Sequence, residues 1–144
     1  MELSLICPVK HIEWTKLLPG RFCIAPIALK HVDYRSYFTN AAIDGYKVIL
    51  DNGIFEDNRV QVEDYINLAR DIKPRVLVIP DIINAGAGAN YDEALSFIDL
   101  VKVEELDNSL YAPVELMFVP QCEKGDADGF WRALDMAMMN DDIQ

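Results

Sequence analysis

The chain has 144 residues, of which 51% are hydrophobic and 26% are charged, and its formal net charge at pH 7 is −11. This length and composition predict one soluble globular domain, and no apolar run approaches the roughly 20 residues of a membrane-spanning helix. Residues 76–144 hold 3 basic and 14 acidic side chains, against 10 of each in residues 1–75, so a nucleic-acid substrate would need a basic surface from another subunit.

The hydrophobic pattern predicts strands that alternate with helices. In chain order, we expect a strand at residues 3–9, a loop at 11–21, a strand at 22–27, a helix at 33–42, a strand at 48–50, a helix at 61–72, a strand at 76–79, a loop at 84–90, a helix at 91–101, a strand at 115–119 and a helix at 128–139. This alternation predicts βα units and a parallel sheet, hence an α/β fold. A complete eight-stranded barrel needs about 250 residues, so the chain forms either a smaller open sheet or part of a barrel.

Helical spacing also predicts which side chains face the core. For the helix at 33–42 these are Tyr34, Tyr37, Phe38 and Ala41, and for the helix at 61–72 they are Val62, Tyr65, Ile66, Ala69 and Ile72. For the last helix we expect Phe130, Trp131, Leu134 and Met138 to point inward.

The sequence offers no metal or cofactor motif. Cys7, Cys23 and Cys122 are far apart and odd in number, which predicts free thiols and neither a zinc site nor a disulfide. Residues 84–90 contain G-A-G without the rest of a dinucleotide or phosphate-binding motif. The first nine residues lack the features of a signal peptide, and we expect a cytoplasmic protein that needs no cofactor.

Polar side chains follow three of the predicted strands. Asp51 closes the strand at 48–50, Asp81 follows the strand at 76–79, and Gln121 follows the strand at 115–119. The carboxyl ends of parallel strands carry the sites of α/β sheets and barrels, so we expect these residues on one rim. The alternatives are structural: a turn for Asp51, a cap for Asp81 and a solvated loop for Gln121.

Two carboxylates and an amide can read the edge of a purine. A carboxylate accepts from a ring N–H and an exocyclic amino group together, and a glutamine offers a donor and an acceptor. Phe55 is available to stack on the base, although most phenylalanines belong to the core. A carboxylate can also act as a nucleophile at a sugar carbon or as a general acid or base.

Three motifs in order give the chain a family resemblance. They are D-N-G-I-F-E at residues 51–56, V-I-P-D at 78–81 and F-V-P-Q-C at 118–122, with F-C-I-A-P-I-A-L upstream. Together they resemble the tRNA-guanine transglycosylase superfamily, and look closest to the phage and bacterial branch that installs 7-deazaguanine bases in DNA. The family motifs read D-S-G-G-[FY]-Q and V-Q-G, so Ile54 and Cys122 depart from the pattern.

The resemblance implies the N-terminal half of a TIM (β/α)8 barrel and a role for each matching residue. Asp51 would be catalytic in proton transfer, and the substrate-binding residues would be Asn52, Gly53, Phe55, Asp81 and Gln121. Asp81 would select guanine-like bases.

The resemblance also implies partners, because the nucleophilic aspartate and the zinc site of the tRNA enzymes belong to later strands. The chain would bind guanine or a 7-deazaguanine such as queuine. It would act on DNA or tRNA only in a homodimer or with a complementing subunit, in the cytoplasm of a bacterium or a phage-infected host.

Two other functions remain open. The first is that the chain is a non-catalytic relative of the transglycosylases that binds a deazapurine or a protein. The second is that the chain is an unrelated small α/β enzyme that acts on a sugar or a phosphorylated substrate, with Asp51 and Asp81 as acid and base.

Overall fold

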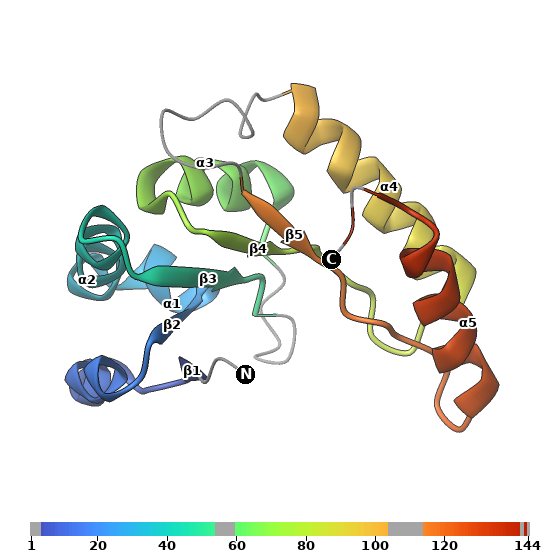
Figure 1. Cartoon of the computed structure of the whole chain (residues 1–144), viewed down its shortest axis with the longest axis horizontal. Coiled ribbons are helices and arrows are strands. Elements are labelled where there is room, and N and C mark those ends of the chain that lie inside the picture. Colours follow the sequence, from blue (N-terminus) through green and yellow to red (C-terminus); the bar gives the residue numbers. More distant parts are fainter. Residues whose placement is uncertain (1–3, 54–59, 104–113, 142, 144) are drawn as a thin grey trace. The chain divides into compact units, whose positions relative to one another are not determined.

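The computed structural model describes residues 4–53, 60–103, 114–141 and 143, and its strands alternate with helices (Figure 1). The elements are β1 (Ser4–Leu5), a 3-10 helix η1 (Val9–Leu17), β2 (Gly20–Ile24), α1 (Ala25–Lys30), α2 (Val32–Ile43), β3 (Lys47–Asp51), α3 (Val62–Ile72), β4 (Val76–Val78), α4 (Ala87–Val103), β5 (Glu115–Met117) and α5 (Ala127–Met138). The predicted α/β fold of parallel βα units is confirmed. None of the helices described is long and apolar enough to cross a membrane.

The five described strands form one parallel sheet in the order β1-β2-β3-β4-β5. Ile24 of β2 lies opposite Asp51 of β3, and Ile49 of β3 lies opposite Val76 of β4. Each strand therefore neighbours the next strand in sequence. A doubly wound sheet reverses its strand order at a switch point, whereas successive strands of a βα barrel follow one another in this way.

The chain divides into two compact units, residues 1–77 and residues 78–144, which we describe separately. The expectation of a single domain over residues 1–144 stays a prediction.

The core of the first unit lies between its strands and the helices α1, α2 and α3, which pack against one another. The side chains predicted to face the core from residues 33–42 and 61–72 are largely buried there. Tyr34, Phe38, Tyr65 and Ile72 are all buried. Tyr37 and Val62 are half-buried at the edges of these faces.

Several element boundaries differ from the predicted ones, and the strand predicted at residues 3–9 already ends at Leu5. Residues 9–17, expected mostly as a loop, form the 3-10 helix η1. The predicted strand at 22–27 ends at Ile24, and α1 begins there with Pro26 in its first turn, where a missing N–H costs no helical hydrogen bond. The helix α4 begins at Ala87, inside the predicted loop at 84–90.

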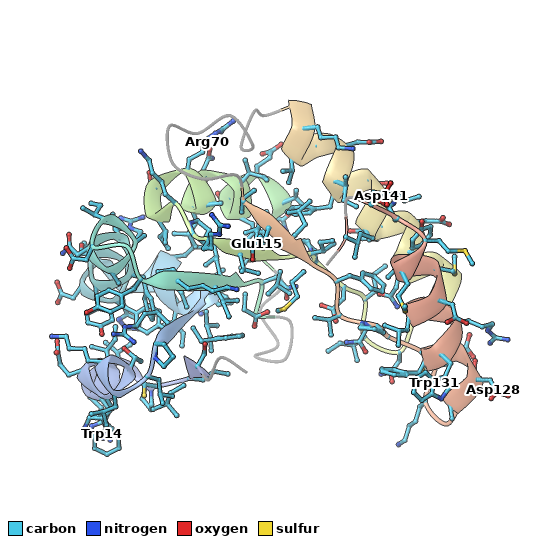
Figure 2. All side chains as sticks on the ribbon, viewed as in Figure 1. Trp14, Arg70, Glu115, Asp128, Trp131 and Asp141 are labelled. Atoms are coloured by element: carbon cyan, nitrogen blue, oxygen red, sulfur yellow. The ribbon has the colours of Figure 1, made fainter. Side chains whose placement is uncertain are left out.

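In the second unit α4 packs against α5, and the predicted inward face of α5 is wrong. Trp131 projects from α5 (Figure 2) and is 60% exposed. Phe130 and Met138 are exposed as well, and Leu134 is half-buried. The buried positions are Gly129, Ala133 and Ala137. Both sets of residues recur at helical spacing, and the small side chains are buried because they let two helix backbones approach closely.

Candidate functional site

The Asp51 segment lies at the carboxyl end of β3, as predicted. Asp51 is the last residue of the strand and is half-buried, while the side chain of Asn52 is buried. Gly53 follows with a φ of 71°. The segment therefore leaves the strand through a left-handed backbone position that favours glycine.

Two buried tyrosines hold the ends of the strands beside Asp51. The hydroxyl of Tyr65 on α3 donates to the carbonyl oxygen of Leu50 at 2.8 Å. The backbone N–H of Ile24, opposite Asp51, donates to the hydroxyl of Tyr34 on α2 at 3.3 Å. Helices and strands are therefore joined at the point where Asp51 emerges, which fixes the position of its backbone.

Removing the Tyr65 hydroxyl tests this anchor. We expect Tyr65→Phe to lower the free energy of unfolding by about 1–2 kcal/mol, because a buried carbonyl loses a neutral hydrogen bond. Tyr46→Phe is the matched control, since Tyr46 is exposed and its hydroxyl has no hydrogen bond within the described residues. Urea denaturation of both variants is the measurement, and equal stability of the two would contradict the anchoring role.

Cys23 lies beside Asp51 and is not a candidate nucleophile. Its side chain is fully buried in β2. Burial raises the pKa of the thiol well above its ordinary value, and the negative charge of Asp51 raises this pKa further. Because its pKa is raised, Cys23 stays a neutral thiol. A nucleophilic cysteine needs the thiolate form, so Cys23 is not a candidate.

Gly53 packs directly on the first turn of α1. A Cβ atom at this position would lie 2.5 Å from Cδ and 2.6 Å from Cγ of Pro26, and 3.1 Å from Cγ2 of Ile24. No side chain fits at these distances, so the D-N-G part of the motif requires glycine for packing as well as for its positive φ.

Asp81 and Gln121 form the second part of the candidate site, and the structure brings them together. Asp81 follows β4 and is only 3% exposed, while Gln121 follows β5 and is half-buried. The side-chain amide Nε2 of Gln121 donates to Oδ2 of Asp81 at 2.5 Å. This contact joins a carboxylate to an amide that retains a carbonyl oxygen and a second N–H for other partners.

Asn90 is a positioning residue that the sequence prediction missed. Its Oδ1 accepts from the backbone N–H of Ile82 at 2.7 Å, and its Nδ2 donates to the carbonyls of Ile82 and Ala85 at 3.2 and 3.3 Å. These bonds hold the segment directly after Asp81 against the first turn of α4. An asparagine among small residues indicates a loop in a sequence, which explains why Asn90 was assigned to one.

Some predictions about the site stay untested. Phe55 falls in residues 54–59, outside the described residues. Asp51 belongs to the first unit and Asp81 and Gln121 to the second, so their shared rim stays a prediction. Among the residues that the structure describes, no group of three His, Cys, Asp or Glu side chains is placed to hold a metal ion.

Comparisons with known proteins do not assign a function to the chain. No family model, no curated protein and no solved structure matches the chain. A proposal about function therefore depends on the motifs of the sequence and on the geometry of the described residues.

Proposed function

We propose that the chain is the base-binding part of a transglycosylase that exchanges guanine or a 7-deazaguanine in nucleic acid. The observation that carries the proposal is the contact between the buried Asp81 carboxylate and the Gln121 amide. The three ordered motifs and the consecutive order of the parallel strands support it.

The chemistry of this pair fits the edge of guanine. A carboxylate accepts from N1–H and the 2-amino group together, and an amide N–H donates to the oxygen at position 6. The burial of Asp81 lowers the competition from water, which strengthens such hydrogen bonds. The contact with Gln121 also holds the carboxylate in place before the base arrives, so less ordering is required on binding.

Asp51 has the catalytic role in this proposal. Its carboxylate would move a proton during the exchange, and Asn52, Gly53 and Phe55 would line the base-binding position. A covalent exchange also needs a carboxylate nucleophile at the sugar carbon, which we assign to a second copy or to another subunit. That partner would also supply the positive charge for DNA or tRNA, because the net charge of −11 opposes contact with phosphates.

Base selectivity provides the test. We expect 7-deazaguanine bases to bind more tightly than adenine, because adenine lacks the N1–H and 2-amino donors and leaves Asp81 without its ligand partners. The cost of such a buried mismatch is about 1–3 kcal/mol. Isothermal titration calorimetry should therefore show a preference of roughly 5- to 150-fold.

Asp81→Asn is the decisive variant because it keeps the shape of the side chain and removes one acceptor. It should abolish most of the preference for 7-deazaguanine. Asp99→Asn on α4 is the matched control, since Asp99 is exposed and makes none of these contacts. Equal affinities for guanine-like bases and adenine, or an Asp81→Asn variant that behaves like the control, would refute the proposal.

A further inference from the structure

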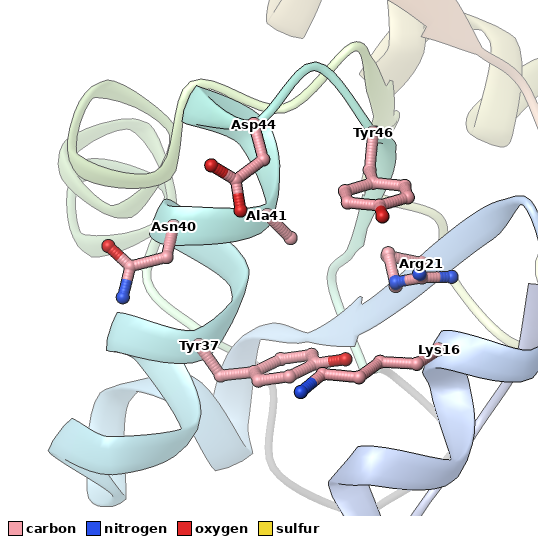
Figure 3. Close-up of a pocket in the computed structure, with 7 residues that line it drawn as sticks. All are labelled: Lys16, Arg21, Tyr37, Asn40, Ala41, Asp44 and Tyr46. Atoms are coloured by element: carbon pink, nitrogen blue, oxygen red, sulfur yellow. The ribbon is translucent and has the colours of Figure 1, made fainter.

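A cavity of about 310 Å³ opens in the first unit, away from Asp51. Side chains from η1, β2, α2 and the segment before β3 line it: Lys16, Arg21, Tyr37, Asn40, Ala41, Asp44 and Tyr46 (Figure 3). Arg21 is the second residue of β2, and Tyr46 directly precedes β3. The cavity therefore lies at the amino ends of these strands, whereas Asp51 lies at the carboxyl end of β3.

Arg21 is an unusual residue to find in this wall because its side chain is almost completely buried, at 2% exposure. Its Nη1 donates to the backbone carbonyls of Thr15 at 2.5 Å and of Leu18. Its guanidinium carbon lies 4.3 Å from the centroid of the Tyr46 ring, a distance typical of a cation–π contact. These contacts fix the plane of the guanidinium group.

No carboxylate pairs with Arg21 among the described residues, and Nε and Nη2 have no hydrogen-bond partner there. Buried charges are normally paired because their desolvation is costly. A buried guanidinium with available donors at a cavity wall therefore indicates a site for an anion. Its planar set of N–H groups matches the oxygens of a phosphate or a carboxylate.

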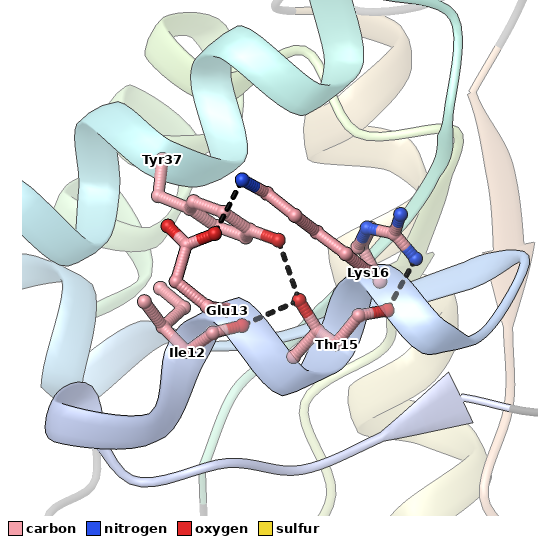
Figure 4. Close-up of polar contacts among 6 residues, drawn as sticks. Ile12, Glu13, Thr15, Lys16 and Tyr37 are labelled. Atoms are coloured by element: carbon pink, nitrogen blue, oxygen red, sulfur yellow. Dashed lines mark hydrogen bonds and ion pairs between the residues drawn. The ribbon is translucent and has the colours of Figure 1, made fainter.

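A second cation borders the same cavity. Lys16 forms an ion pair with Glu13, and its Nζ lies 5.9 Å from the centroid of the Tyr37 ring (Figure 4). The hydrogen bond with Glu13 raises the pKa of Lys16 above its ordinary value. The hydroxyl of Tyr37 is 2.7 Å from that of Thr15, which holds the aromatic wall in place.

We propose that this cavity binds a small molecule through a compact oxyanion, with Arg21 and Lys16 as its cationic partners. The volume lies near the lower end of about 300–1,000 Å³ for small-molecule sites, which selects a small ligand. Asp44 and Asn40 also line the cavity, and the carboxylate of Asp44 would accept from a hydroxyl or amino group of the same ligand. This site is independent of the proposed base-binding residues.

Two exposed residues of opposite charge allow a test that leaves Arg21 intact. The probes are inorganic phosphate and acetate, titrated into the full chain by calorimetry. Lys16→Gln should weaken binding by roughly fivefold, because it removes one of the two positive charges at the cavity wall. Asp44→Asn should strengthen binding by a similar factor, because it removes a negative charge from the wall.

Lys10→Gln and Asp64→Asn are the matched controls, since both residues are exposed in the first unit, lie outside the cavity and undergo the same change of charge. Saturable binding of phosphate alone would assign a phosphorylated ligand, and binding of acetate alone would assign a carboxylate. If neither probe binds saturably at millimolar concentration, or if the cavity variants change affinity no more than the controls, the proposal is wrong. Neither result bears on the binding of guanine at Asp81.

Discussion

Replacing Arg21 by methionine is expected to lower the free energy of unfolding by about 1–3 kcal/mol, the range for leaving buried carbonyl oxygens without their hydrogen-bond donor. Methionine fills much of the same space but donates no hydrogen bond. The carbonyls of Thr15 and Leu18 would lose their hydrogen-bond donor, and the ring of Tyr46 would lose the cation that packs against it.

The two tryptophans give a direct measurement, because Trp14 belongs to the first unit and Trp131 to the second. In a Trp131→Phe background, the fluorescence of Trp14 reports the unfolding of the first unit in urea. Arg70→Met is the control, since Arg70 is exposed on α3, and surface changes usually stay within about 0.5 kcal/mol. An Arg21→Met variant as stable as this control would show that the buried contacts contribute little.

The role of Arg21 illustrates what the sequence could not predict. Arginine is normally an exposed residue, and residue 21 fell at the end of a predicted loop. Its acceptors are the carbonyls of Thr15 in η1 and of Leu18 directly after this helix, and the sequence does not show that they lie beside residue 21. The cavity combines residues from η1, β2, α2 and the segment before β3, and no spacing in the sequence marks such a combination.

Other features were predictable because a local pattern in the sequence determines them. The periods of α2 and α3 identify their buried faces because one side of each helix is consistently apolar. The position of Asp51 at the end of β3 was predictable because an apolar run ends there. The pairing of Asp81 with Gln121 was expected only as a shared rim, since the direct hydrogen bond depends on loop conformations after β4 and β5.

The face of α5 was predicted wrongly because hydrophobicity alone decided it. Phe130, Trp131 and Met138 are more apolar than Gly129, Ala133 and Ala137, yet the small residues are the buried ones. Burial of a helix face also depends on how closely the neighbouring helix approaches, which is a property of shape.

Replacing Gly53 by alanine is expected to lower the free energy of unfolding by about 3 kcal/mol, which combines a left-handed backbone penalty with a packing clash. The new methyl group would lie 2.5 Å from the ring of Pro26. The proline ring is held in the first turn of α1, so it has little freedom to move away. The strand end that carries Asp51 would have to shift instead.

Gly45→Ala separates the two causes, because Gly45 has a φ of 84° but no atom within 4 Å of an added Cβ. It should cost about 1–2 kcal/mol from the backbone alone. The double variant Pro26→Ala, Gly53→Ala then isolates the clash: alanine at 53 should be less costly where the proline ring is absent, a coupling that a double-mutant cycle measures. Trp14 fluorescence in the Trp131→Phe background again reports stability. If Gly53→Ala costs no more than Gly45→Ala, and Pro26→Ala does not reduce its cost, then contact with α1 is not what requires glycine after Asp51 and Asn52.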